Sequence, residues 1–243
     1  MDEKPEVLKK IYPVWGEITM PNFSLSDEHF HRVTETTQIM FHLAASLKLE
    51  ATLKPNILMN LTGTKFVLEA AKQMKNLIQM IHTSTAFCNV EHEVMEEKVY
   101  DFPHRPEDLI RCAEWMSEEA MAEAQKEVLG LHPNTYTYTK RLAEILVRDE
   151  YNKGSLPVCI VRPSIVCPSY VEPIPGWVDS LNGPPGILIA GGKGALRCLM
   201  LNTKSNFEAI PVDAAINGLI MIAKQLATLP QRYVNRFGLR KDC

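Results

Sequence analysis

A tyrosine and a lysine, Tyr136 and Lys140, stand four residues apart at the start of a helical stretch. Residues at this spacing share one face of a helix, so the phenol and the ammonium group can lie side by side. A positive charge stabilises a phenolate and lowers the tyrosine pKa from about 10 toward working pH. Such a pair can donate a proton to a carbonyl oxygen. The same spacing also fits a solvated tyrosine and a surface lysine, so the surrounding elements must distinguish the two.

The segments around this pair alternate between short apolar runs and amphipathic stretches. Short apolar runs, the last one closed by a proline, are typical of buried parallel strands. We expect strands at residues 39–45, 77–84 and 157–163, and helices at residues 60–74, 107–128 and 138–151. This order predicts an α/β fold in which a parallel sheet carries helices on both faces.

Two of the expected helices show an apolar face at helical spacing. In residues 60–74 that face is formed by Leu61, Thr64, Val67, Leu68 and Ala71. In residues 107–128 it is formed by Leu109, Met116, Ala120 and Ala124.

Composition limits the class of protein. The 243 residues are 46% apolar and 23% charged, with a net charge of −3. The overall charge therefore does not attract nucleic acid or an anionic membrane. No apolar run reaches the ~18 residues that cross a bilayer, so we expect a soluble chain. Six cysteines without paired spacing indicate reduced thiols in an intracellular protein. His42 and His82 fit core histidines, and no cluster has metal-ligand spacing, so we predict no metal.

Residues 168–198 are rich in glycine and proline. We expect an irregular region there, lying over a site rather than forming part of the core. The Gly-Gly-Lys-Gly turn at residues 191–194 could approach a phosphate closely, or it could be a flexible loop with an exposed lysine.

Eight short motifs in this sequence resemble those of the extended short-chain dehydrogenase/reductases, and within them the fatty acyl-CoA reductases. They follow the family's order over roughly residues 10–225. The motifs are FHLAA at 41–45, NLTGT at 60–64, HTSTAFCN at 82–89, PNTYTYTK at 133–140, VRPSIV at 161–166, GW at 176–177 with NGP at 182–184, GKG at 192–194 and IPVD at 210–213. The resemblance implies a Rossmann-like fold and NADPH as the cofactor.

The resemblance also implies roles for individual residues. Tyr136 would protonate the substrate oxygen, while Lys140 would lower its pKa and hold the nicotinamide ribose. Ser84 or Thr85 would hydrogen-bond the carbonyl oxygen; either could instead end a strand and cap the following turn. The implied cofactor contacts are Glu17, Ile18, Ala44, Ala45, Asn60, Tyr136, Lys140, Pro163, Ser164, Ile165 and Val166, and the implied substrate contacts are Trp177, Lys193 and Arg197.

The family's activity is the reduction of long-chain fatty acyl-CoA to a fatty alcohol through an aldehyde. The resemblance therefore implies lipid metabolism at the cytosolic side of peroxisomal or endoplasmic reticulum membranes. It allows a dimer and peripheral membrane association, with fatty acyl-CoA as the partner molecule.

A fold of this kind normally opens with a strand and a Gly-x-x-Gly-x-x-Gly turn that holds the pyrophosphate. No such turn occurs here, and residues 3–18 resemble the family's third strand and the segment before it. We expect residues 1–243 to form one incomplete reductase domain that lacks two βα units, about 60 residues, and the family's C-terminal helical domain. Without its first strands, the sheet should expose two edges and an apolar helix face.

Two other interpretations stay open. A truncated, non-catalytic paralogue would bind acyl-CoA or pair with a full-length reductase, and the missing glycine turn favours it. A different extended reductase, such as a steroid dehydrogenase or a sugar-nucleotide epimerase, would carry another loop in place of residues 176–184.

Overall fold

Three parallel strands lie at the centre of the computed structural model, which describes residues 5–228 except 201, 203, 205 and 206. The strands are β1 (Ile39–His42), β2 (Gln79–Thr83) and β3 (Val158–Val161), in the order β1-β2-β3. Met40 pairs with Met80, which pairs in turn with Val158. The predicted parallel sheet is confirmed. Each strand is shorter than expected, because the chain leaves the sheet early to form the loops at its carboxyl edge.

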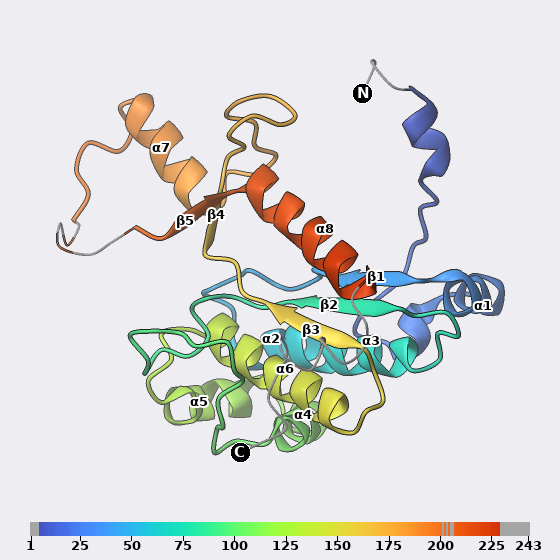
Figure 1. Ribbon diagram of the computed structural model, residues 1–243. Helices are drawn as coiled ribbons and strands as arrows, with labels where there is room; N and C mark the ends of the chain where they lie inside the picture. Colours follow the sequence, from blue (N-terminus) through green and yellow to red (C-terminus); the bar gives the residue numbers. More distant parts are fainter. Residues whose placement is uncertain (1–4, 201, 203, 205–206, 229–243) are drawn as a thin grey trace.

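Helices lie on both faces of this sheet, as predicted (Figure 1). One face carries a continuous helical segment made of α2 (Leu53–Asn56), the wider π-helical turn η3 (Ile57–Thr62) and α3 (Gly63–Ala71), together with α6 (Thr135–Asn152). The other face carries α8 (Val212–Thr228), which packs on β2. The elements before β1 are η1 (Pro5–Lys10), η2 (Pro21–Ser24) and α1 (Asp27–Thr36).

The main core lies between the sheet and the first helical layer. Its largest fully buried apolar side chains include Leu53, Ile57, Leu61, Met80 and Leu142. Burying each such side chain contributes roughly 1.5–3 kcal/mol. The apolar face predicted for residues 60–74 is buried throughout, so that prediction is confirmed.

The helix predicted over residues 107–128 is in fact two helices, α4 (Pro106–Trp115) and α5 (Glu118–Leu129). The break falls at Met116, whose backbone is extended, and the Ser117 side chain accepts a hydrogen bond from Ala120 N–H at 3.2 Å. A serine that caps a new helix competes with continuation of the old one. The most deeply buried side chains of the two helices are Pro106, Ile110, Ala113, Met121 and Leu129, while Leu109 and Met116 of the predicted face are partly buried and pack against the core.

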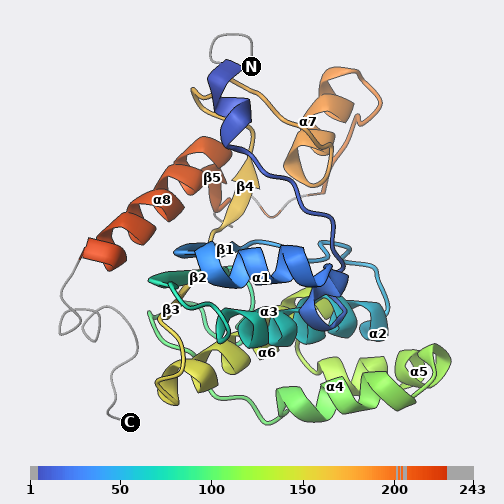
Figure 2. The same ribbon diagram turned by 90° about the vertical axis from the view of Figure 1, so that its right-hand side faces the viewer.

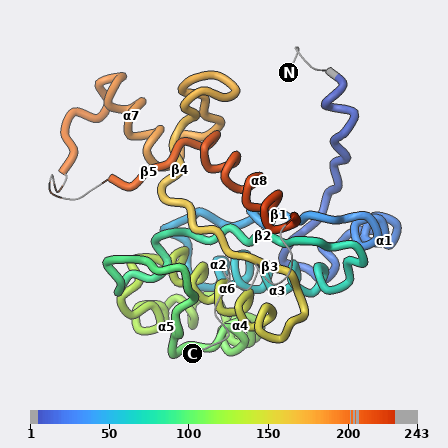
Figure 3. The backbone as a smooth tube through the Cα atoms, viewed as in Figure 1, coloured from blue at the N-terminus to red at the C-terminus, as the bar shows by residue number. Residues whose placement is uncertain are grey.

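A smaller lobe contains the glycine- and proline-rich region. Its two parallel strands, β4 (Ile165–Cys167) and β5 (Ala209–Pro211), stand apart from the main sheet with α7 (Pro184–Gly192) (Figure 2). The chain enters this lobe after β3 and returns to the sheet through α8 (Figure 3). The expectation of an irregular region is wrong for residues 184–192, which form helix α7. Two prolines occupy the first positions of this helix, where proline is favoured.

The Gly-Gly-Lys-Gly turn closes helix α7. Gly194 has a φ of 73° and its N–H donates to the carbonyl of Gly191 at 2.9 Å. Glycine adopts this left-handed conformation without the strain a side chain would cause. The turn is therefore the end of a helix.

Apolar surface is exposed along β1, as expected. Within the described residues β1 and β3 form the two edges of the main sheet. Ile39 and Phe41, on the face that carries α8, are 39% and 41% exposed, and Ile220 and Met221 of α8 are exposed as well.

Two buried imidazoles lie side by side at the carboxyl ends of β1 and β2. The ring centroids of His42 and His82 are 5.0 Å apart. His42 Nε2 lies 3.1 Å from the hydroxyl of Thr64, whereas neither ring nitrogen of His82 has a hydrogen-bond partner. Both are core histidines, as predicted, although only His42 is satisfied. Burial lowers the pKa of His42 to about 4 and that of His82 well below its usual value.

These histidines should make the fold sensitive to acid. Unfolded His42 takes up a proton below about pH 6.5, but the folded residue does so only below about pH 4. The unfolded state therefore binds more protons in this window, and the free energy of unfolding should fall by about 3 kcal/mol as the pH drops through it. Urea unfolding at several pH values measures the slope. His42→Gln should make this pH dependence less steep and leave the part due to His82, while the exposed control His31→Gln should keep the wild-type slope; equal slopes in all three proteins would contradict the assignment.

Candidate active site

Helix α6 presents Tyr136 and Lys140 near its amino terminus. Its cap is Asn134, whose side-chain oxygen accepts a hydrogen bond from Thr137 N–H at 2.9 Å. A capping asparagine satisfies a backbone N–H that has no partner within the helix. The cap therefore fixes where the helix begins, and with it the position of the pair.

Lys140 is anchored to the end of β2. It is 4% exposed, and its Nζ donates to the backbone carbonyl of Thr83. Burial lowers the pKa of Lys140 to about 8, while the carboxylate of Glu144 acts in the opposite direction. The side chain is therefore mostly an ammonium group at neutral pH, held in a site that favours its neutral form.

The predicted lowering of the Tyr136 pKa by Lys140 is not found. Burial raises the pKa of Tyr136, and a hydrogen bond with the Thr85 side chain only partly offsets this. Burial is the largest influence on the pKa of Tyr136, and the Lys140 ammonium donates to the Thr83 carbonyl. The phenol is therefore protonated at neutral pH, as a proton donor must be.

The structure distinguishes the two candidate hydroxyls after β2. The Ser84 hydroxyl points to Cys88, with Oγ 3.8 Å from Sγ. Thr85 interacts with Tyr136 and also accepts the N–H of Phe87 at 3.3 Å. Thr85 thus lies next to the phenol while capping the following turn, so the catalytic and structural interpretations of this hydroxyl are compatible.

Asn60, implied to contact the cofactor, is fully engaged by the protein. Its side-chain oxygen accepts the N–H of Ser46 at 2.7 Å, and its amide nitrogen donates to the carbonyl of Ser46 at 3.3 Å. The same nitrogen donates to the hydroxyl of Thr139 at 3.1 Å. Asn60 therefore ties the loop after β1 to helix α6.

A second asparagine makes a parallel connection one turn earlier. Asn56 Nδ2 donates to the carbonyl of Lys48 at 3.2 Å and to the hydroxyl of Thr135 at 2.6 Å. Both amides project from the segment that contains the π-helical turn η3. Sequence reasoning missed this residue, although the matching four-residue spacings of the two asparagines and of Thr135 and Thr139 could have indicated it.

The remaining implied cofactor residues lie after the carboxyl ends of β1 and β3 or, for Glu17 and Ile18, near the start of α3. The carbonyl of Pro163 accepts Ala86 N–H at 3.0 Å, and Ser164 leads from there into β4, which contains Ile165 and Val166. Ala44 and Ala45 lie in the loop after β1, with Ala44 exposed.

Glu17 and Ile18 precede η2. The Glu17 carboxylate accepts the N–H and the hydroxyl of Thr19 at 3.0 and 2.8 Å. Ile18 packs on Gly63, where an added Cβ would lie 3.3 Å from its side chain. These contacts hold a turn against helix α3.

The implied substrate residues are not gathered in one place. Trp177 lines a pocket of about 660 Å³ between η1 and the start of α8, with Pro173 and Ile216. Lys193 and Arg197 lie exposed at the end of α7, where Arg197 Nε donates to the carbonyl of Gly194 at 3.4 Å.

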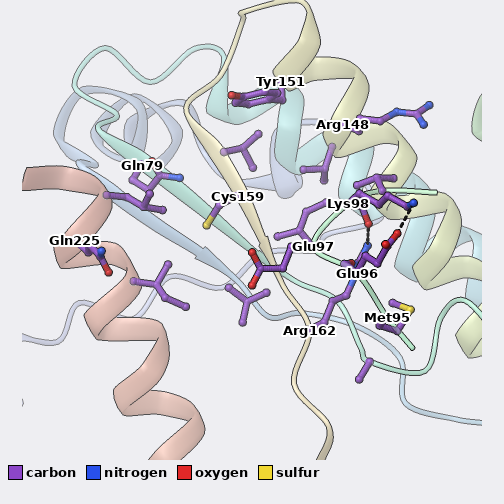
Figure 4. Close-up of a pocket in the computed structure, with 18 residues that line it drawn as sticks. Gln79, Met95, Glu96, Glu97, Lys98, Arg148, Tyr151, Cys159, Arg162 and Gln225 are labelled. Atoms are coloured by element: carbon purple, nitrogen blue, oxygen red, sulfur yellow. Dashed lines mark hydrogen bonds and ion pairs between the residues drawn. The ribbon is translucent and has the colours of Figure 1, made fainter. Parts of the chain in front are cut away.

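A second pocket, of about 530 Å³, lies along the outer side of β3 (Figure 4). It is bounded by β3, α6, α8 and the segment 95–99. One of its lining residues, Arg162, forms a buried ion pair with Glu144 of α6 that sequence reasoning did not identify.

Among the residues that the structure covers, no three His, Cys, Asp or Glu side chains gather to hold a metal ion. None of the helices in the same part of the chain is long and apolar enough to traverse a membrane.

The parallel sheet with helices on both faces defines the class of the fold as Rossmann-like α/β, similar to that of solved NAD(P)-binding structures. Solved structures agree on the fold. The terminal reductase domain of the myxalamid biosynthetic pathway matches with a TM-score of 0.66 and 20% identity, over 93% of this chain and 48% of that one. UDP-glucuronic acid 4-epimerase from Bacillus cereus matches with a TM-score of 0.52 and 16% identity, over 82% of this chain and 52% of that one.

Curated sequences define the family more narrowly. The NAD-binding domain family described as male sterility protein matches residues 1–219. Fatty acyl-CoA reductase 2 of Mus musculus is 41% identical over 220 residues, and fatty acyl-CoA reductase 1 of Homo sapiens is 40% identical over 218 residues. The chain belongs to this fatty acyl-CoA reductase family. The matches cover 90% and 89% of this chain but 42% of each relative.

Removal of the Asn60 amide should loosen the loop after β1. Asn60→Ala leaves the N–H of Ser46 without its partner, and an unsatisfied buried group costs about 1–3 kcal/mol. Urea unfolding should show that loss, and amide exchange at Ser46 should speed up. The exposed Asn76, which donates to the carbonyl of Glu35 at 2.6 Å, is the matched control. An Asn60→Ala protein as stable as Asn76→Ala would contradict this role.

Proposed function

We propose that this chain carries the reductase site of an alcohol-forming fatty acyl-CoA reductase that uses NADPH. The observation that supports it best is the placement of Tyr136, Lys140 and Thr85 together at the carboxyl end of β2, in a chain of this family. Long-chain fatty acyl-CoA is the substrate we assign, with action at peroxisomal or endoplasmic reticulum membranes as part of the same proposal.

The residues present fit the nicotinamide half of the cofactor. Lys140 and Tyr136 offer donors for the ribose, and the small side chains of Ala44 and Ala45 leave room beside the strand ends. A bound NADPH would supply the hydride. For the pyrophosphate, the sequence contains no Gly-x-x-Gly-x-x-Gly turn.

Side chains of the protein donate the proton and stabilise the negative charge that develops on the carbonyl oxygen. Tyr136, protonated because burial raises its pKa, donates to the carbonyl oxygen as hydride reaches the carbon. Thr85 donates a second hydrogen bond to that oxygen, and two aligned donors stabilise it by a few kcal/mol. The thioester step gives a hemithioacetal that loses CoA thiol to leave the aldehyde. The aldehyde step gives the alcohol, so Tyr136 must regain a proton in between.

A second candidate is a non-catalytic paralogue that binds acyl-CoA or pairs with a full-length reductase. Because the sequence contains no glycine-rich turn for the pyrophosphate, NADPH binding by this chain is the property to measure. Calorimetry of NADPH with the purified 243-residue chain separates the two. Saturable micromolar binding supports the reductase, whereas a folded protein without binding contradicts it.

The phenol of Tyr136 should be essential for turnover. Tyr136→Phe should lower kcat for acyl-CoA reduction by 10²–10⁴-fold, because the proton donor is lost, and spare most NADPH binding. Tyr138→Phe is the matched control, since that hydroxyl contacts His104 at 2.7 Å; it should retain turnover. Activity in Tyr136→Phe equal to that of the control would exclude Tyr136 as the acid.

Thr85 should matter more than Ser84. Thr85→Val removes the hydroxyl beside Tyr136 while keeping the shape, and kcat should fall by ~10² or more. Ser84→Ala removes only the contact with Cys88 and should have a mild effect. Steady-state kinetics of both variants measure the two losses in kcat. A larger loss of kcat in Ser84→Ala than in Thr85→Val would assign the catalytic hydroxyl to Ser84 instead.

A further inference from the structure

A buried ion pair between Glu144 and Arg162 lies one helical turn beyond Lys140 on α6. Glu144 follows Lys140 by four residues on α6 and is 1% exposed. Its two oxygens accept hydrogen bonds from Arg162, at 2.7 Å from Nε and 2.6 Å from Nη2. Tyr136, Lys140 and Glu144 therefore follow one another at four-residue intervals along the same side of the helix.

Arg162 is held from its other side as well. Its Nη1 donates to the carbonyl of Glu96 at 3.0 Å, and its Nη2 donates to the carbonyl of Lys98 at 2.7 Å. Figure 4 shows Arg162 reaching this segment at the wall of the β3 pocket. With four hydrogen bonds, the guanidinium has little freedom to turn, so it fixes the position of the Glu144 carboxylate.

The same carboxylate reaches the segment after β2. Cys88 Sγ donates to Glu144 Oε1 at 3.3 Å, and Cys88 itself receives contacts from Ser84 and Asn89. Glu144 thus connects α6, the end of β3 and the turn that carries Thr85. A buried ion pair of this kind adds little net stability once both charges have lost water, so stability alone does not explain the arrangement.

The Glu144 carboxyl group also raises the pKa of Lys140, against the effect of burial. The groups that face Lys140 are Glu144 of α6, the Cys88 thiol, and the imidazoles His42 of β1 and His82 of β2. The imidazoles are neutral because burial lowers both pKa values, and burial raises the pKa of the thiol to about 12. Among these neighbours, the Glu144 carboxyl group is the one that forms an ion pair with Arg162, and it opposes the burial that lowers the pKa of Lys140 to about 8.

We propose that Glu144, oriented by Arg162, is a positioning residue that keeps the Lys140 side chain charged as an ammonium group. The role of Lys140 in catalysis rests on the proposed function, but its charge in the folded protein does not.

The proton equilibrium of Lys140 tests this directly. Lysine is labelled with ¹³C at Cε, the signal of Lys140 is assigned by its loss in Lys140→Arg, and its shift is followed from pH 6 to 11. We expect a midpoint near 8 in the wild type and a midpoint lower by about one pH unit or more in Glu144→Gln, a tenfold or greater loss of proton affinity. A purely structural role of Glu144 would lower the melting temperature without moving this midpoint.

Two further variants complete the test. Glu150→Gln is the matched control, since Glu150 lies on the same helix but pairs with Lys72 at 2.6 Å; its midpoint should equal that of the wild type. If Glu144→Gln does not fold, Glu144→Met with Arg162→Met removes both charges together and should show the same lowered midpoint. An unchanged midpoint in the folded variant, or an equal shift in Glu150→Gln, overturns the proposal. If the wild-type protein binds no NADPH, the proposed function is contradicted. The Lys140 titration can still be measured in that case and still tests the role of Glu144.

Discussion

The burial of a polar helix is the constraint on which this structure depends. Residues 137–147 of α6 are all buried, and they include a lysine, an arginine and a glutamate. Because an unpaired buried polar group costs several kcal/mol, each must find a partner. The partners come from separate segments: Asn56 and Asn60 from the helical segment around η3, the Thr83 carbonyl from β2, Arg162 from just after β3, and Glu91 from the loop between β2 and α4. The hydrogen bonds that the buried polar groups of α6 require therefore hold the surrounding segments in position.

The same burial sets the electrostatics of the site. Low solvent access lowers the pKa of Lys140, His42 and His82 and raises that of Tyr136. The phenol of Tyr136 is therefore protonated and both imidazoles are neutral at neutral pH. The Glu144 carboxyl group opposes the loss of the Lys140 charge.

Sequence reasoning predicted the elements better than the contacts. Apolar periodicity identified the three strands and the buried face of residues 60–74, because burial imposes that pattern directly. It failed at residues 107–128, where the cap at Ser117 ends one helix and starts another. Its assignment of Asn60 to the cofactor stays a prediction: the structure shows the protein contacts of this side chain, with Ser46 and Thr139, which a motif cannot specify because it gives only a residue type. For the same reason it left Ser84 and Thr85 undecided.

The sequence by itself determined the order of strands and helices, the spacing of Tyr136 and Lys140, and the family. These are local or statistical properties of the chain. Only the tertiary structure decided which groups meet: Lys140 with the Thr83 carbonyl 57 residues away, and Asn60 with Thr139 79 residues away. The first bond depends on where the sheet places the end of β2 and the second on how η3 packs against α6, so the fold decides both. The pKa values followed from those contacts and from burial, so they too were fixed by the fold.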